Sequence, residues 1–73
     1  MLTFKEKQVL EIIGKNLLIR KEELARTLKN EGFDDGFSEL EKLKGRGLVN
    51  EVDAIGSLCY ALTKEGMSAI KGS

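Results

Sequence analysis

Few side chains in this sequence of 73 residues could carry out covalent or acid–base catalysis. Histidine is absent, and the single cysteine, Cys59, lies in an apolar run without a neighbouring Lys or Arg to stabilise a thiolate. No glycine-rich phosphate loop follows a strand, and the usual cluster of metal-binding side chains is missing. The sequence therefore predicts a protein that is not an enzyme and that uses neither a metal nor a cofactor.

The charged residues divide unequally along the chain, although twelve basic and twelve acidic residues leave no net charge. Residues 1–31 carry seven positive and five negative charges, a net of +2. Residues 33–62 carry three positive and six negative charges, a net of −3. Because neutralisation of phosphates dominates the affinity of proteins for DNA, this second segment is unusually acidic for a DNA-binding surface.

Length and composition are typical of one small globular domain spanning residues 1–73. Hydrophobic residues make up 41% and charged residues 33%, which argues against disorder. No apolar run approaches the roughly 20 residues that span a bilayer, and the first residues do not form a signal peptide. We therefore expect a soluble, cytoplasmic protein. The many Lys and Glu residues are also compatible with a thermophilic source.

The first predicted helix begins at Thr3, which forms the pattern of a capping box with Glu6, and it ends near Lys15. The apolar run over 17–19 is expected to be a three-residue strand or a linker. A second helix is predicted over 21–30. The stripe that the first helix should bury is marked by Leu10, Ile13 and Leu17 and widened by Phe4, Val9 and Ile12.

A third helix is predicted over 34–45, because apolar residues recur there at intervals of four and three. Asp34 or Asp35 is expected to cap it, and Gly45 and Gly47 are expected to end it. The stripe that faces the core consists of Phe33, Phe37, Leu40 and Leu43.

A β-hairpin and a short helix are predicted to complete the chain. The strands are expected over 48–52 and 58–62, joined by a five-residue loop that contains a glycine. Thr63 is placed to cap a final helix that runs through Ile70, with Met67 and Ile70 as its apolar members. The predicted fold class is thus α+β and mostly helical.

This order of elements resembles winged helix-turn-helix transcription regulators of the multiple-antibiotic-resistance type. Three segments carry the resemblance: the spacing Leu40, Leu43 and Gly47 before Leu48, and the runs over 60–66 and 19–25. The resemblance implies a three-helix core, a two-stranded wing and a short C-terminal helix. It also implies that the third helix, about 34–45, is a recognition helix that binds double-stranded DNA.

The resemblance also implies which side chains would contact DNA. Steps of about 100° around the third helix place Ser38 and Lys42 outward, with Arg46 on its flank. In this fold the start of the second helix commonly lies against the DNA backbone. The predicted nucleic-acid-binding residues are Arg20, Lys21, Ser38, Lys42 and Arg46.

Two functions remain open from the sequence. The first is a small DNA-binding transcription regulator. The second is a protein–protein interaction domain that docks a partner through the acidic face of the third helix or through the wing, where Ile55 would be an exposed apolar contact. Without long flanking dimerisation helices, we expect a monomer or a homodimer formed through the wing or the terminal helices.

Overall fold

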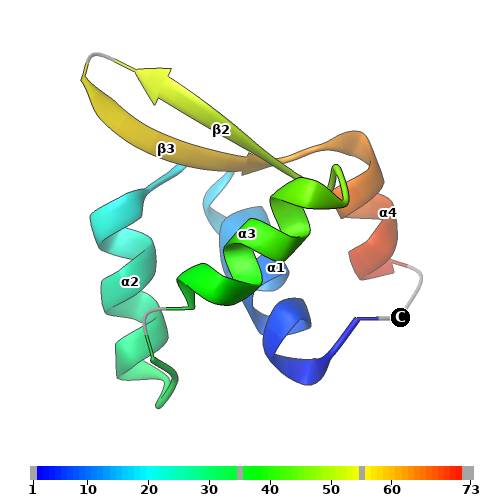
Figure 1. Ribbon diagram of the computed structural model, residues 1–73, viewed down its shortest axis with the longest axis horizontal. Helices are drawn as coiled ribbons and strands as arrows, with labels where there is room; N and C mark the ends of the chain where they lie inside the picture. Colours follow the sequence, from blue (N-terminus) through cyan, green and yellow to red (C-terminus); the bar gives the residue numbers. More distant parts are fainter. Residues whose placement is uncertain (1, 35, 55, 72–73) are drawn as a thin grey trace.

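A computed structural model of the protein describes residues 2–34, 36–54 and 56–71. Within these residues, four helices and a three-stranded antiparallel sheet follow the order α1, β1, α2, α3, β2, β3, α4. The helices α1 (Phe4–Asn16), α2 (Lys21–Asn30) and α3 (Phe37–Gly45) lie on one side of the sheet, and α4 (Lys64–Lys71) lies beside α1 (Figure 1). This is the predicted winged helix-turn-helix architecture.

The capping box at the start of α1 is confirmed. The Glu6 amide donates to Thr3 Oγ1 at 3.1 Å, and the Thr3 amide donates to Glu6 Oε1 at 2.8 Å. The helix ends at Asn16, and Leu17 then adopts a positive φ of 61° that turns its side chain outward, where it is 79% exposed. The prediction that Leu17 continues the buried stripe is therefore wrong, because the helix stops before its position. Phe4, in the first turn, is also exposed rather than buried.

The segment between α1 and α2 is a strand, although it is shorter than predicted. β1 (Ile19–Arg20) has two residues, and it pairs antiparallel with β3 (Ser57–Leu62). α2 occupies the predicted range 21–30, and Leu24 and Leu28 on its inner face are fully buried. The wing sheet therefore has a third strand at one edge, which the sequence left undecided.

Helix α3 begins later than predicted and is capped differently. Its first residue is Phe37, and its N-cap is Gly36, which makes no side-chain cap and has a φ of +71°. The prediction that Asp34 caps this helix is wrong, because Asp34 lies two residues before the cap; Asp35 lies outside the described residues. A Cβ at position 36 would overlap Leu28 Cδ1 of α2, so the close approach of the two helices requires glycine here.

The wing consists of β2 (Val49–Ala54) and β3, which are longer than predicted. Their register pairs Val49 with Leu62 at the base and Ala54 with Ser57 near the tip. Three of the five residues of the predicted loop, 53, 54 and 57, thus belong to the strands. Ile55, the predicted apolar contact at the tip, lies outside the described residues.

Helix α4 is capped as predicted, since the Gly66 amide donates to Thr63 Oγ1 at 3.0 Å. Gly66 is buried against the carbonyl oxygen of Leu48, where a Cβ would overlap that backbone atom. Of the two predicted apolar members of this helix, Ile70 packs against the core, whereas Met67 is 51% exposed.

The core lies where α1, α2, α3 and the sheet converge. Leu40 and Leu43 of α3 are buried as predicted, while Phe33 and Phe37 are half-buried at its edge. Tyr60 of β3 is also buried, with 2% of its surface exposed. Among the described helices, none is long and apolar enough to cross a bilayer.

Candidate nucleic-acid interface

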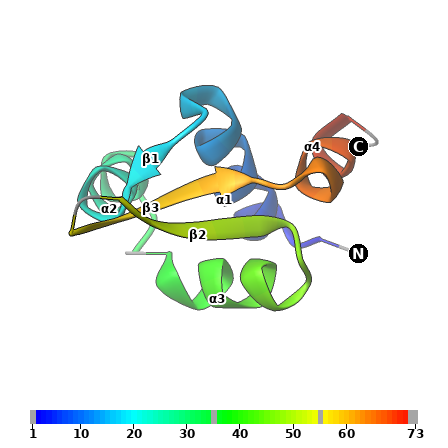
Figure 2. The same ribbon diagram turned by 90° about the horizontal axis from the view of Figure 1, so that it is seen from above.

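The outer surface of α3 is built around two small residues. Leu40 and Leu43 point into the core, so at about 100° per residue the opposite side of the helix carries Ser38 and Gly45. Both are exposed. Figure 2 shows that α3 lies at one side of the molecule and that the C-terminal end of α1 lies at the other. The backbone of α3 is therefore open to a partner along this line of small residues.

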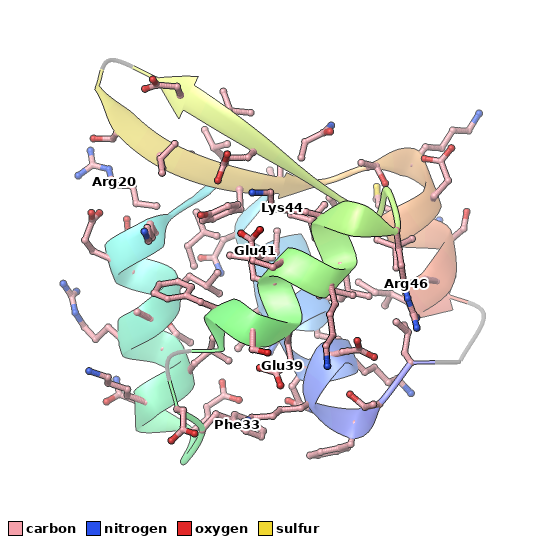
Figure 3. All side chains as sticks on the ribbon, viewed as in Figure 1. Arg20, Phe33, Glu39, Glu41, Lys44 and Arg46 are labelled. Carbon is pink, nitrogen blue, oxygen red and sulfur yellow. The ribbon has the colours of Figure 1, made fainter. Side chains whose placement is uncertain are left out.

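Two flanks border the outer surface of α3, one toward the wing and one toward the N-terminal part of α1. The wing-side flank consists of Glu41 and Lys44. The α1-side flank consists of Glu39, Lys42 and Arg46, the last of which directly follows the helix. Figure 3 shows Glu41 and Lys44 on the side of α3 next to the strands, and Glu39 and Arg46 extending away from the wing.

The wing-side flank is a closed network of ion pairs and hydrogen bonds. Lys44 Nζ lies 3.2 Å from Glu41 Oε2 and 3.1 Å from Glu51 Oε2 on β2. Tyr60 Oη on β3 donates to the same Glu51 oxygen at 3.3 Å. Hydrogen bonds to Glu51 and then Glu41 raise the pKa of the Lys44 ammonium. Lys44 thus joins α3 to β2, and Glu51 extends the network to β3 through Tyr60.

The two outer cations of the α1-side flank form no ion pair with a carboxylate of the residues that the structure describes. Glu39 is paired across the helix interface with Lys5 of α1 at 4.0 Å, and the Glu39 side chain is only 17% exposed. Lys42 and Arg46 are both exposed, and neither lies within 4.0 Å of an acidic group of the described residues. These two side chains can therefore meet an anionic partner without first breaking an ion pair.

Glu6, a buried residue of α1, interacts electrostatically with these two cations. Its pKa is held below the ordinary value of 4.5 chiefly by the hydrogen bond from the Thr3 amide, and burial acts in the opposite direction. The positive charges of Arg46 and Lys42 lower the pKa of Glu6 further, which indicates that both lie within electrostatic reach of its carboxylate. The capping box of α1 is thereby coupled to the α1-side flank.

The remaining predicted contact residues lie away from the centre of α3. Lys21 Nζ lies 5.1 Å from the centroid of the Phe37 ring, so it bridges the start of α2 and the start of α3. Arg20 is exposed on β1, opposite Cys59 of β3, and in Figure 3 it lies on the far side of the view from Arg46. The structure thus brings together Ser38 and Lys42 on α3 and Arg46 directly after it.

A concave region lies between α1 and α4. It is an open cleft of about 410 Å³ with an apolar floor that includes Gly14, Leu62 and Ile70. Glu11, Lys15 and Lys71 are the charged residues of its lining. Its lining includes no cysteine, serine or threonine as nucleophile, and the described residues include no cluster of three metal-binding side chains.

Sequence reasoning missed the residues that decide the charge of the surface. Glu41 and Lys44 are three residues apart in a helix, which is a detectable ion-pair spacing. Glu51 could not have been added to that pair without the register of the wing. Lys5 could not have been matched to Glu39 without the packing of α1 on α3.

No model of a known protein family matches the sequence, and a search of curated proteins found no match. Solved structures do match. A cysteine-to-serine mutant of MarR from E. coli has a TM-score of 0.85 at 22% identity, over 97% of this chain and 54% of that chain. The same mutant complexed with operator DNA has a TM-score of 0.82 at 22% identity, over 97% of this chain and 52% of that one.

RosR from H. salinarum has a TM-score of 0.80 at 25% identity, over 97% of this chain and 69% of that chain. The chain spans about half the length of the MarR chains that it matches. These likenesses show that the fold is the winged helix-turn-helix of MarR-type structures, as the sequence predicts.

Proposed function

We propose that this chain is a DNA-binding winged-helix domain of a transcription regulator, with α3 (Phe37–Gly45) as its recognition helix. In this arrangement α3 enters the major groove and the wing approaches the DNA backbone. The observation that carries the proposal is the α1-side flank, where Lys42 and Arg46 are exposed and lie within 4.0 Å of no carboxylate in the described part of the chain. A structure with the same fold complexed with operator DNA supports this choice. We propose no catalytic activity.

Each predicted contact residue has a distinct role in this proposal. Lys42 and Arg46 contact phosphates along one strand, and Ser38 reaches a base edge or a phosphate from the centre of α3. Arg20 and Lys21 contact the backbone at the start of α2, where Lys21 is held near α3 by the Phe37 ring. Because so few cations take part, one copy should bind weakly and with strong dependence on salt.

A protein–protein interaction domain is the second candidate, and the wing favours it. Glu51 and Asp53 are exposed acidic residues on β2. Val52 and Leu58 on the same hairpin are 40% and 37% exposed. A ribbon with acidic and apolar side chains suits a basic, partly apolar protein surface better than it suits phosphates. If this candidate is correct, the partner contacts the wing and no DNA is bound.

Titration into fluorescently labelled duplex DNA at low salt tests the proposal directly. Wild-type protein should raise the fluorescence anisotropy, and the double variant Lys42→Glu/Arg46→Glu should not. The matched control is Lys15→Glu/Lys71→Glu, which changes the net charge equally at exposed positions away from α3. Light scattering of the free protein should give the mass of a monomer or a dimer.

Two results would contradict the proposal. One is no change in anisotropy with wild-type protein at low salt. The other is an equal loss of binding in the double variant and the control, which would mean that net charge, and not the α1-side flank, accounts for the affinity.

A further inference from the structure

Glu41 is an acidic residue at a position where a DNA-binding helix would meet base edges. On the surface of α3 it lies next to the line formed by Ser38 and Gly45, on the side toward the wing. Its side chain is 69% exposed. A free carboxylate there would be repelled by phosphates. A glutamate at this position therefore either prevents DNA binding or serves as a specific hydrogen-bond acceptor.

The carboxylate of Glu41 is neither free nor randomly oriented. Lys44 Nζ binds Glu41 Oε2 at 3.2 Å, and Lys44 is itself held by Glu51 Oε2 at 3.1 Å. Glu51 in turn accepts a hydrogen bond from Tyr60, whose ring is buried in the core. The chain of contacts runs from a fixed core residue to Glu41, so it restricts the direction in which Glu41 points.

The same contacts reduce the electrostatic cost of placing Glu41 near DNA. The Lys44 ammonium lies at nearly the same distance from both carboxylates. Glu41, Glu51 and Lys44 together therefore carry a net charge of −1, whereas the two carboxylates alone would carry −2. Only one carboxylate oxygen of Glu41 is used by Lys44. The other oxygen, Oε1, can accept a hydrogen bond from a partner.

The chemistry of base edges selects one partner for such an acceptor. In the major groove, guanine presents two acceptors and thymine presents an acceptor and a methyl group, so neither can donate to a carboxylate. Adenine presents its N6 donor next to the N7 acceptor, which repels a carboxylate. Cytosine presents the N4 donor alone. A fixed carboxylate therefore favours cytosine.

We propose that Glu41 is a specificity-determining residue that accepts a hydrogen bond from N4 of a cytosine in the major groove. Lys44 is a positioning residue that orients Glu41 and ties it to the wing, and it does not contact phosphate. This inference rests on the proposed DNA-binding function, and it names the base pair, C·G, that the same surface recognises.

The test is selection from a library of short duplexes with a randomised central segment. Wild-type protein should enrich duplexes with cytosine at one fixed position, with a preference of roughly tenfold over other bases. Glu41→Gln should move that preference to adenine, because a glutamine amide can bind N6 and N7 together. Lys44→Gln should weaken the cytosine preference severalfold without choosing a new base.

Glu65→Gln is the control, since it removes the charge of an exposed glutamate on α4, outside α3 and the wing. It should keep the cytosine preference, and circular dichroism should give the same helix content for all variants. An unchanged preference in Glu41→Gln, with DNA still bound, would overturn the inference and leave the proposed function standing. If wild-type protein enriches no duplex at all, both the proposed function and the inference fail.

Discussion

The two flanks of α3 use the same kinds of charged side chain for different purposes. On the wing-side flank, Lys44 forms ion pairs with both Glu41 and Glu51, so its positive charge is compensated within the protein. On the α1-side flank, Glu39 pairs with Lys5 of another helix, and the cations of the flank itself stay exposed. One short helix thus separates internal ion pairing from a surface that is available to an anionic partner.

This difference shows why a count of charges along the sequence is misleading. Residues 33–62 have a net charge of −3, but Lys5 from outside that segment compensates Glu39, and Lys44 draws Glu41 and Glu51 together. The acidic character is therefore concentrated toward the wing. The basic character is concentrated at the edge of α3 that faces α1.

The largest expected effect is on stability, at the N-terminal end of α3. The contact of this end with α2 helps to set the rotation of α3 about its axis and therefore which flank faces α1. Gly36→Ala should lower the free energy of unfolding by about 2–4 kcal/mol, because alanine is strained at positive φ and its Cβ overlaps Leu28. Gly45→Ala, at the other end of the helix, meets no atom within 4 Å and should stabilise by about 0.5–1 kcal/mol.

Chemical denaturation of both glycine variants measures these changes. Equal stabilities for Gly36→Ala and wild type would contradict the left-handed conformation of Gly36 and its close approach to Leu28.

The salt dependence of DNA binding should separate the flanks next. Lys42→Gln or Arg46→Gln should each reduce the slope of log K against log salt by about 1, as expected for the loss of one phosphate contact. Lys44→Gln should leave the slope nearly unchanged, because Lys44 is engaged with two carboxylates. Anisotropy titrations over a series of salt concentrations provide the slopes, and an equal reduction in all three variants would abolish the distinction.

A smaller effect concerns the support of the α1-side flank by Glu6. Glu6→Gln should lower the free energy of unfolding at pH 7 by about 0.3–1 kcal/mol, through the loss of a negative charge at the start of α1. The pKa of Glu6 is lowered in the folded protein, so its contribution is complete above the ordinary value of 4.5. The contribution is lost as the pH falls through the folded-state pKa.

Urea denaturation of wild type and Glu6→Gln at pH 7 and at acidic pH checks this sign. The two curves should converge as the pH decreases. A difference that grows toward acid would show that the carboxylate destabilises the folded protein.

The smallest effect tests the wing-side network through Tyr60, which is the one tyrosine of the sequence. Burial, followed by the charge of Glu51, raises the pKa of Tyr60 above its ordinary value of 10. Glu51→Gln should bring the pKa of Tyr60 partway back, because burial remains, and Glu39→Gln should not change it. Because the folded state favours the protonated phenol, this contribution to stability is present below pH 10 and is lost as the pH rises through the folded-state pKa.

Ultraviolet absorbance during an alkaline titration follows Tyr60 alone. An identical titration curve in wild type and Glu51→Gln would show that Glu51 does not interact with the phenol in solution.

Local sequence signals predicted much of the fold. The capping box of Thr3 and Glu6, the range of α2 and the cap at Thr63 are all found as expected, because each depends on residues within one turn of each other. The predicted start of α3 was wrong because the helix is capped by Gly36, where Leu28 of α2 leaves no room for a Cβ atom. That contact comes from another helix and has no local signal. The prediction for Leu17 was wrong because its positive φ, just after the end of α1, turns the side chain outward, and side-chain periodicity does not reveal such a backbone conformation.

The candidate site was less predictable than the fold. Helix geometry alone predicts that Ser38 and Lys42 point outward with Arg46 on the flank, and all three side chains are exposed. The separation into two flanks depends on Lys5, Glu51 and Tyr60, which come from three other elements. Long-range pairing of this kind has no local signal, so helix geometry placed Lys42 outward but could not show that Lys44 pairs with Glu51 of the wing.

The most direct test of the account is chemical-shift mapping of isotopically labelled protein as duplex DNA is added. We expect the largest amide shifts in α3 and at Arg46, smaller shifts at the start of α2 and in the wing, and little change in the cleft between α1 and α4. Shifts confined to the wing or to that cleft, or none at low salt, would contradict the claim that α3 is the surface that binds DNA.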